Sequence, residues 1–192
     1  MRRPVKRIYL AGPDVFLPDA SKHGALKSRL CSEAGFEGLF PLDQSLDLAG
    51  LASGEQARRI ARANETLMQS CDLLIANLTP FRGASMDAGT AYEVGYMRAL
   101  GRPVLGYTNS PQDYADRAAV FRAKCAAPDD CDAPSIEIES FGLAENLMIE
   151  IAIRESGGRV IRTHVPPGAG MTDLTGFIEC LAEARRLTAS DN

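Results

Sequence analysis

Short apolar runs alternate with segments of helical periodicity along this chain, and the alternation limits its fold more than any other feature. The clearest run, at 72–78, is almost continuously apolar. Such a run is typical of a strand in a parallel sheet that is covered on both faces. Four further strands are predicted at 5–11, 36–42, 103–107 and 159–163. A helical segment separates each strand from the next, so the strands should run parallel.

Helices are predicted between the strands and after the last one, at 21–35, 54–70, 89–100, 144–155 and 173–187. Strand–helix–strand units of this kind are right-handed and build one sheet. We therefore expect a single α/β domain over residues 1–188. Its sheet should be open, parallel and five-stranded, with helices on both faces, a flavodoxin-like or Rossmann-like architecture and the strand order 2-1-3-4-5.

Two stretches fall outside this repeat. Residues 109–140 contain several Pro, Asp and Ser residues around a short helical piece at 115–124. We interpret them as an inserted excursion that serves as a lid or as an oligomer contact. Residues 189–192 are expected to form a disordered tail.

The charge balance and the cysteine pattern exclude several classes of partner and site. With 21 basic and 25 acidic residues the formal net charge is −4 at pH 7, which argues against nucleic-acid and membrane partners. Five cysteines without a C-x-x-C pair and two distant histidines predict neither a disulfide framework nor a metal site. The first apolar run breaks at Gly12, so neither a signal peptide nor a membrane span is expected. We expect a cytoplasmic protein with reduced thiols.

Polar side chains gather where the predicted strands end, at the edge of an open α/β sheet where ligands bind. They are Tyr9, Asp14, Asp43, Asn77, Asp87, Glu93 and Asn109, with Arg82 as the basic residue nearby. A set so rich in carboxylates suits a sugar better than a phosphate. Neither a G-x-G-x-x-G turn after the first strand nor a G-x-x-x-x-G-K-S/T motif is present, and we expect no cofactor.

The most informative pair of carboxylates is Asp87 and Glu93. Asp87 stands at the expected N-cap of the helix at 89–100, and Glu93 follows about a turn and a half later on an apolar face. The helix N-terminus stabilises a nearby anion by up to roughly 1 kcal/mol, which should help to hold Glu93 ionised. Such a carboxylate suits a reaction that passes through a sugar cation. The spacing equally permits a plainer interpretation, in which Asp87 only caps the helix and Glu93 is a solvated surface residue.

Three motifs in sequence order resemble the nucleoside 2-deoxyribosyltransferase family. They are residues 8–13 (Ile-Tyr-Leu-Ala-Gly-Pro), the stretch at 87–93, and residues 145–148 (Glu-Asn-Leu-Met). The resemblance covers residues 7–151. It implies transfer of a 2-deoxyribosyl group between the nucleobases of purine or pyrimidine 2′-deoxynucleosides, in nucleoside salvage, through a covalent glycosyl ester on a glutamate.

The same resemblance implies roles for single residues. Glu93 matches the glutamate that forms the ester, Tyr9 matches the tyrosine that holds it in place, and Asp87 matches the carboxylate that binds the sugar hydroxyls. Asn146 and Met148 match residues that reach into the neighbouring subunit's site and contact the 5′ side of the sugar. The resemblance therefore implies a homo-oligomer of at least two subunits.

One position departs from the family pattern. Several members carry an aspartate eight residues ahead of the aspartate that opens the third strand, and counting back from Asp72 leads to Asn64. An amide has no carboxylic proton to give. Either Asn64 only hydrogen-bonds the base or sugar, or the departing base takes its proton from water or from another residue such as Asp14, which we also expect to contact the substrate. The alternative is that Asn64 is an ordinary polar residue on a helix.

Four further residues are candidates for contact with the substrate. Phe16 and Phe81 follow the first and third strands and are expected to stack on the base, although Phe81 could equally pack in the core. Gly12 lies in the turn after the first strand, and Gly89 lies at the start of the helix that carries Glu93. Whether purines, pyrimidines or both are accepted is left open, because single hydrogen bonds decide such selectivity.

Two other functions stay open at this point. The first is a 2′-deoxynucleoside 5′-monophosphate N-glycosidase, which would cleave the same bond with water and would need a phosphate cradle after the first strand. Asp14 stands in that turn and would repel a phosphate. The second is a non-catalytic nucleoside-binding module, since a fold alone does not fix a function.

Overall fold

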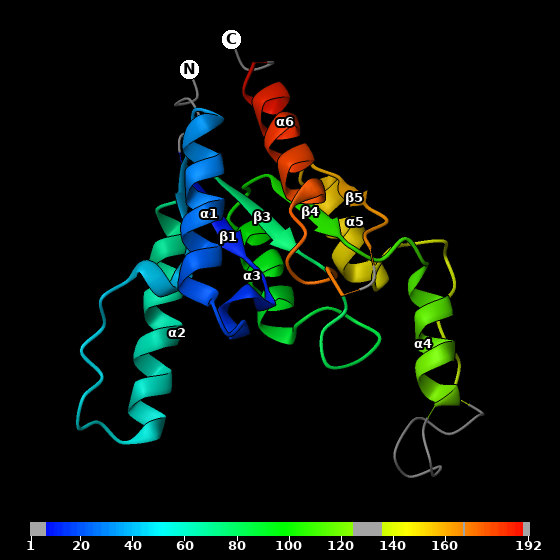
Figure 1. The fold of residues 1–192 in the computed structure, drawn as a ribbon, viewed down its shortest axis with the longest axis horizontal. Helices are drawn as coiled ribbons and strands as arrows, with labels where there is room; N and C mark the ends of the chain where they lie inside the picture. The colour runs from blue at the N-terminus through cyan, green and yellow to red at the C-terminus, as the bar shows by residue number, and fades with distance from the viewer. Residues whose placement is uncertain (1–6, 125–135, 167, 190–192) are drawn as a thin grey trace.

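Five short parallel strands form the central sheet, in the order β2-β1-β3-β4-β5 (Figure 1). The computed structural model describes residues 7–124, 136–166 and 168–189. The strands are β1 (Arg7–Ala11), β2 (Glu37–Leu39), β3 (Leu73–Asn77), β4 (Val104–Thr108) and β5 (Val160–Arg162). All neighbouring pairs are parallel. The predicted α/β class, sheet and strand order are therefore confirmed.

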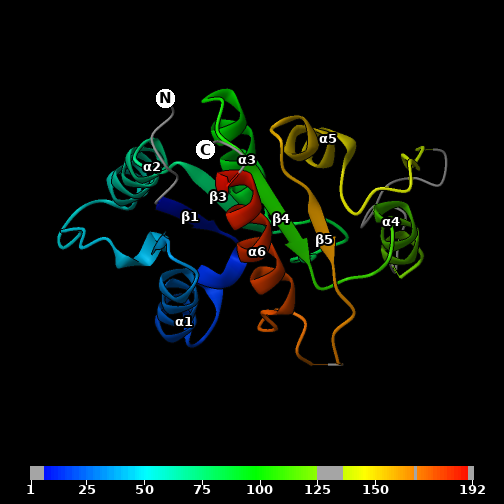
Figure 2. The same ribbon diagram turned by 90° about the horizontal axis from the view of Figure 1, so that it is seen from above.

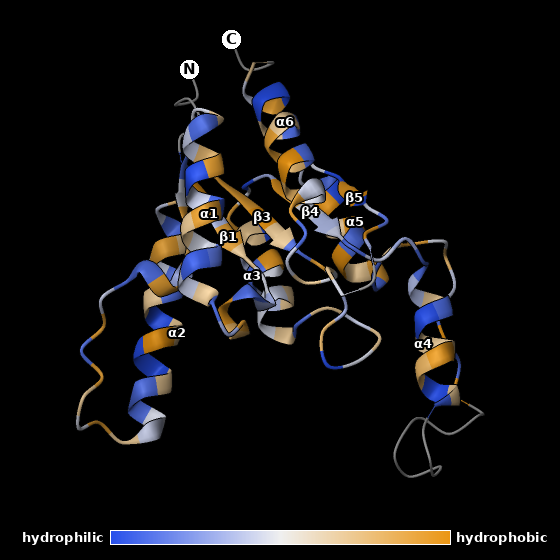
Figure 3. Ribbon diagram, in the orientation of Figure 1, coloured by the Kyte–Doolittle hydropathy of each residue, from blue (hydrophilic) through white to orange (hydrophobic). Residues whose placement is uncertain are grey.

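Helices cover both faces of the sheet (Figure 2). They are α1 (Ala20–Glu33), α2 (Ser53–Gln69), α3 (Ala88–Ala99), α4 (Tyr114–Ala123), α5 (Leu147–Glu155) and α6 (Thr175–Ala189), with the short 3-10 helices η1 (Pro13–Phe16) and η2 (Pro41–Asp43). The core on one face joins the strands to α1 and α6, and the core on the other joins them to α2, α3 and α5. Figure 3 shows apolar residues concentrated on the strands and on the helix faces turned toward them, as burial of the sheet requires.

Alternation along β1 decides which of its side chains face α3. Ile8 and Leu10 belong to the core under α1 and α6, whereas Tyr9 and Ala11 belong to the core on the opposite face. All four are fully buried, and the period of two is that of an ordinary strand. Tyr9 therefore faces α3, the helix that carries Glu93.

β2 is shorter than predicted and ends at Leu39 instead of residue 42. Pro41 has no N–H with which to continue the ladder. Directly before it, the Phe40 N–H donates to the Asp43 carboxylate at 3.2 Å and closes the turn of η2. The chain therefore leaves the sheet early and continues along its carboxyl edge.

Most helix boundaries lie within one to three residues of the predicted ones, and two of the differences concern the start of α5 and the predicted tail. α5 begins at Leu147 instead of residue 144, because Asn146 is its N-cap and accepts a hydrogen bond from the Met148 N–H at 3.0 Å. α6 continues through Ala189, which was expected to belong to the tail. The rest of the predicted tail, and the first two residues of the predicted strand at 5–11, lie outside the described residues.

The predicted excursion at 109–140 contains α4, which lies at one end of the molecule beyond α5 (Figure 1). Arg117 anchors this helix to the body. Its Nε donates to the Ala84 carbonyl at 2.9 Å, and its Nη2 donates to the Ala144 carbonyl at 2.7 Å. Residues 125–135 lie outside the described part of the chain, and the role of the excursion stays a prediction.

The described cysteines are free and buried; they are Cys31, Cys71 and Cys180. Within the described ranges, no group of three or more His, Cys, Asp or Glu residues is arranged to hold a metal ion. No helix within these same ranges has both the length and the apolarity that a membrane crossing requires.

Candidate active site

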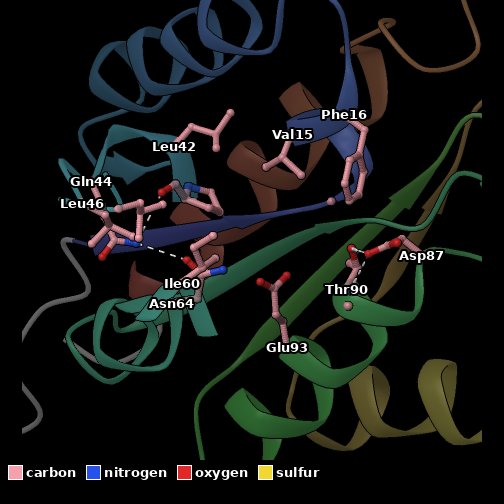
Figure 4. Close-up of a pocket in the computed structure, with 14 residues that line it drawn as sticks. Val15, Phe16, Leu42, Gln44, Leu46, Ile60, Asn64, Asp87, Thr90 and Glu93 are labelled. Carbon is pink, nitrogen blue, oxygen red and sulfur yellow. Dashed lines mark hydrogen bonds between the residues drawn. The ribbon is translucent and has the colours of Figure 1, made fainter. Parts of the chain in front are cut away.

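A cavity of about 460 Å³ opens at the carboxyl edge of the sheet, between the loops after β1 and β2 and the helices α2 and α3 (Figure 4). Its walls are formed by Gly12, Val15, Phe16, Pro41, Leu42, Gln44, Leu46, Leu48, Ile60, Asn64, Asp87, Gly89, Thr90 and Glu93. Six residues that the sequence singled out are therefore brought together, namely Gly12, Phe16, Asn64, Asp87, Gly89 and Glu93.

The cavity has two chemically different ends. Asp87, Thr90 and Glu93, from the first turns of α3 and its cap, form one end, as Figure 4 shows. Leucine side chains from the loop after β2 and Ile60 of α2 form the other, and the polar groups there are the amides of Gln44 and Asn64. We call these the carboxylate end and the amide end. Oxygen acceptors suit the hydroxyls of a sugar, and an apolar wall with a few amides suits a flat heterocycle.

Tyr9 holds Glu93 from below the cavity. The Tyr9 hydroxyl donates to Glu93 Oε1 at 2.5 Å. Tyr9 is fully buried in the core, and burial, followed by the neighbouring Glu93 charge, raises the pKa of its hydroxyl well above the ordinary value. The hydroxyl therefore keeps its proton and remains a donor, which fixes one oxygen of Glu93 and leaves the other to face the cavity.

Glu93 is not held ionised as the sequence suggested. Burial raises its pKa, the hydrogen bond from Tyr9 lowers it and the Asp87 charge raises it, and together these effects bring it to about 7. The helix dipole acts most strongly within the first turn of a helix. α3 begins at Ala88, so Glu93 lies beyond that turn. Desolvation is therefore the larger effect. Near neutral pH the protonated and ionised forms coexist.

Asp87 caps α3, as one interpretation of the sequence required. Its Oδ2 accepts from the Thr90 N–H at 3.0 Å and from the Thr90 hydroxyl at 3.2 Å. A Cβ on Gly89 would lie 2.9 Å from the same oxygen, so a residue without a side chain suits this position. Asp87 also lines the cavity beside Glu93, so the cap holds a second carboxylate at the carboxylate end. Glu93 is half-buried and bonded to Tyr9, and is not a solvated surface residue.

Asp14 does not line the cavity but lies under its floor. Its Oδ1 lies 2.9 Å from His23 Nε2 and 3.4 Å from Lys27 Nζ, and its Oδ2 accepts from Asn77 Nδ2 at 3.3 Å. Burial would raise its pKa, but the Lys27 charge and the bonds from His23 and Asn77 bring it to about 2. An acid this strong holds no proton to give to a departing base at neutral pH, which argues against Asp14 as the donor.

The buried Lys27 and the turn at Gly12 belong to the same arrangement. Lys27 is fully buried, and its ammonium group lies over the Tyr107 and Phe177 rings at 5.7 and 5.0 Å from their centroids. A Cβ on Gly12 would overlap the Asp14 carboxylate, and its φ of +153° is one that side chains rarely adopt. The Asp14 carboxylate of the ion pair thus packs directly against Gly12, in the turn that forms the cavity floor.

Phe16 and Phe81 stack on each other and do not form two separate walls. Their ring centroids lie 5.4 Å apart with an interplanar angle of 12°. The Arg82 guanidinium covers both rings, at 4.9 and 4.6 Å from the centroids. Phe16 lines the cavity and Phe81 does not, so Phe81 supports Phe16 instead of facing a ligand directly.

At the amide end, Asn64 was singled out from the sequence, but the apolar wall was missed. Gln44 Nε2 donates to Asn64 Oδ1 at 3.2 Å (Figure 4). The apolar wall comes from Leu42, Leu46 and Leu48, which lie in a loop without strand or helix periodicity. The available signal was the cluster of leucines in an otherwise polar loop directly after a strand.

Asn146 and Met148 lie away from the cavity of their own chain. Asn146 Nδ2 donates to Glu139 Oε2 at 3.0 Å, and Met148 is 69% exposed. Neither residue lines the cavity. Met148 is therefore presented outward at the start of α5, whereas the half-buried Asn146 side chain is bonded within its own chain.

Glu145 ties the start of α5 to the loop before α3, a role that the sequence did not suggest. It is fully buried. Its carboxylate accepts from the Ser85 hydroxyl at 2.6 Å and from the Met86 N–H at 3.0 Å, and Arg117 Nη2 lies 3.3 Å from it. Met86 directly precedes Asp87, so this buried ion pair supports the carboxylate end from behind.

A family model described as nucleoside 2-deoxyribosyltransferase matches residues 8–148. The chain belongs to this family. The resemblance seen in the sequence motifs is thereby confirmed. Nucleoside 2-deoxyribosyltransferases and their relatives act on small nucleosides, so membership places the chain among enzymes that transfer a glycosyl group or cleave an N-glycosidic bond.

Similar proteins extend the family match. An uncharacterized protein of Schizosaccharomyces pombe is 35% identical over 167 residues, which cover 80% of this chain and 79% of that protein. The solved structure of a 2-desoxiribosyltransferase from Leishmania mexicana is 31% identical, with a TM-score of 0.57, over 75% of this chain and 85% of that one. A conserved protein from Enterococcus faecalis V583 has the same TM-score at 23% identity, over 93% of this chain and 98% of its own; it supports the fold alone.

The first prediction concerns the bond between Tyr9 and Glu93. Because the Tyr9 hydroxyl stabilises the carboxylate form, Tyr9→Phe should raise the pKa of Glu93 above about 7, by roughly one unit or more. The measurement is a carbon-13 NMR titration of labelled glutamate, with Glu93→Gln to assign the resonance. Tyr96→Phe is the control, because its hydroxyl bonds to Gln69 at the surface. A Glu93 pKa in Tyr9→Phe at or below that of the wild type would contradict the geometry.

The second prediction concerns the buried ion pair. Asp14→Asn leaves the Lys27 charge buried without a carboxylate and should lower the free energy of unfolding in urea by about 3–5 kcal/mol. Asp14→Asn combined with Lys27→Met should cost less than the sum of the single changes, because no buried charge is left unpaired. Losses that simply add would show that the two groups do not interact.

The same pair has a defined pH dependence. The folded-state pKa of Asp14, about 2, lies below its ordinary value of 3.8. Its stabilising contribution is therefore present above pH 3.8 and is lost as the pH falls through about 2. In Asp14→Asn the free energy of unfolding should lack this part of its dependence on pH below 3.8.

Proposed function

We propose that this chain transfers a 2-deoxyribosyl group from one nucleobase to another, by retaining double displacement through a glycosyl ester on Glu93. One observation carries the proposal. Glu93 accepts a 2.5 Å hydrogen bond from Tyr9 and faces a cavity whose carboxylate end suits a sugar and whose amide end suits a base. Membership of the family and the likeness to the Leishmania mexicana 2-desoxiribosyltransferase support it.

In the first step Glu93 is the nucleophile. Its carboxylate oxygen forms a bond to C1′ of the sugar while the bond from C1′ to the base nitrogen breaks, and the electron pair of that bond stays on the base. Positive charge builds up on the sugar ring during this exchange, and the ionised carboxylate stabilises it. Tyr9 keeps the nucleophile in one orientation, so little ordering is needed when substrate binds.

In the second step an incoming base takes the place of the one that left. Its nitrogen bonds to C1′ from the face that the first base occupied, and the ester bond to Glu93 breaks. Two inversions give net retention, which is the logic of retaining glycosidases. One protein nucleophile serves both steps, and the second carboxylate, Asp87, is placed to accept hydrogen bonds from the sugar hydroxyls.

The sugar that suits this chemistry lacks its 2′-hydroxyl. An electron-withdrawing group beside C1′ would destabilise the positive charge that forms as the bond to the base breaks. A 2-deoxyribosyl group therefore reaches the transition state more readily, which favours deoxynucleosides over ribonucleosides. We place the reaction in nucleoside salvage.

A second subunit is proposed to complete the site. Neither Asn146 nor Met148 lines the cavity of its own chain, and Met148 is 69% exposed. In a homo-oligomer these side chains would close the neighbouring cavity beside the sugar. Closure of this kind also keeps water from the glycosyl ester, so that transfer can compete with hydrolysis.

The third prediction tests the reaction itself. The protein is incubated with a deoxynucleoside and a different free base, and the swapped nucleoside is measured by chromatography. Glu93→Gln should lower its formation by at least about 10³-fold, because the nucleophile is lost. Glu155→Gln is the matched control, since Glu155 is an exposed carboxylate that pairs with Arg98 on the surface.

Each result of this assay identifies one function. Swapped product that depends on Glu93 supports the transferase. Free base without swapped product identifies an N-glycosidase, and use of 5′-monophosphates in place of nucleosides tests its nucleotide form. Binding without turnover identifies a non-catalytic nucleoside-binding module. Swapped product in Glu93→Gln would remove Glu93 from the role assigned to it.

The fourth prediction tests the second subunit. Glu93→Gln and Asn146→Ala chains are co-expressed and purified together, with the mass of the assembly measured by light scattering. A mixed dimer has one intact site only if Asn146 acts in its neighbour's cavity, so random pairing should restore about a quarter of wild-type activity. Activity no higher than that of the separate variants would place Asn146 in its own chain's site or outside any site.

A further inference from the structure

The amide end of the cavity offers a departing base hydrogen bonds but no acid. Of the described residues that line the cavity, Asp87 and Glu93 carry the ionisable side chains. Both belong to the carboxylate end; in Figure 4 Asp87 lies farthest from the amides of Gln44 and Asn64, and Glu93 lies between Asp87 and Asn64. Where the base would lie, the described polar side chains are therefore two amides.

The orientation of both amides is fixed by one backbone carbonyl. Gln44 Nε2 donates to the Pro41 carbonyl at 3.3 Å and to Asn64 Oδ1 at 3.2 Å. A carbonyl can only accept, so Gln44 must present its NH₂ group there, and Asn64 must in turn present its oxygen to Gln44. The Asn64 NH₂ group is left to point toward Glu93, as Figure 4 shows. At this point Asn64 is a donor of hydrogen bonds and cannot release a proton.

Acids close to the amide end are engaged elsewhere. Asp43 accepts from the Phe40 N–H and does not line the cavity. Asp14 lies in its buried ion pair under the floor. Glu65 lines an adjoining hollow between α2 and α3, where its Oε1 accepts from the Tyr92 hydroxyl at 2.5 Å. Because that hollow shares Asn64 and Glu93 with the cavity, Glu65 is a rival as a proton donor and needs a direct test.

We propose that this enzyme releases the base without a proton from an acid of its own, and that Asn64 thereby restricts it to deoxynucleosides whose bases are good leaving groups. This inference rests on the proposed function. The bond from C1′ to the base nitrogen breaks as the bond from C1′ to Glu93 forms, and the electron pair stays on the base. The base leaves as an anion, held by the Asn64 NH₂ group, and then takes up a proton from water.

The same restriction applies in reverse. An incoming base has to lose a proton before its nitrogen attacks C1′, and Asn64 cannot accept that proton. Bases that ionise easily in water should therefore be the better acceptors as well as the better leaving groups. The substrate class is defined by the acidity of the base and not by its size.

The test is the dependence of rate on the pKa of the leaving base. Single-turnover base release is measured for two series of deoxynucleosides, one of substituted purines and one of 5-substituted uracils, each graded by the pKa of the free base. In the wild type the rate should fall by about tenfold for each unit rise in that pKa. Asn64→Asp keeps an oxygen for Gln44 and replaces only the NH₂ group that faces Glu93. It should flatten the slope, with gains of up to about 10²-fold for the poorest leaving groups.

Three further variants separate this effect from structural change. Asn64→Ala should slow every member of the series without flattening the slope. Gln69→Glu adds a carboxyl on the same helix at an exposed site bonded to Tyr96, and it should retain the wild-type slope. Glu65→Gln should also retain it; a steeper slope in Glu65→Gln would make Glu65 the acid and overturn the inference.

Two other results would also overturn the inference. One is a wild-type rate that does not depend on the pKa of the base, and the other is an equal slope in the wild type and Asn64→Asp. Base release that survives Glu93→Gln would overturn the proposed function, and this inference with it. Release that depends on Glu93 but not on the pKa of the base would overturn this inference alone.

Discussion

Burial of the central strands on both faces governs where this molecule can place polar chemistry. Every residue of β3 and β4 is buried, and an unpaired polar group inside such a layer would be costly. Reactive side chains are therefore confined to the carboxyl edge, where the loops after β1 and β2, the helix α2 and the start of α3 meet. The sheet is the common support of these segments, and it sets the distance between Tyr9 on β1 and Glu93 on α3.

The topology and the carboxylate end could be predicted from the sequence because both depend on patterns among residues that are close together in the chain. Continuous apolar runs mark buried parallel strands, and helical segments between them leave few ways to connect the sheet. Asp87 and Glu93 are separated by a fixed length of helix, so recognising the N-cap places both. The family motifs added Tyr9, whose contact with Glu93 joins residues far apart in the chain.

The remaining features depend on contacts that no local pattern contains. A lysine on an amphipathic helix normally faces water, and Lys27 is buried only because η1 brings Asp14 against it. The amide end is built by a loop without periodicity, so its leucines gave no helical or strand signal. Glu145 belongs to the motif at 145–148, but its burial depends on the approach of Ser85, Met86 and Arg117 from distant parts of the chain. The pKa of Glu93 likewise depends on desolvation, which a sequence does not record.

The raised pKa of Glu93 has opposite consequences for folding stability and for the proposed reaction. The folded state raises it from 4.5 to about 7 and so favours the neutral acid. The stabilising contribution of Glu93 is complete below pH 4.5 and is lost as the pH rises through about 7. The nucleophilic attack proposed for Glu93 requires the ionised form, which is the form that the fold disfavours. Glu93 therefore contributes least to folding stability above about pH 7, where its ionised form is most abundant. Stability and activity are opposed at this residue.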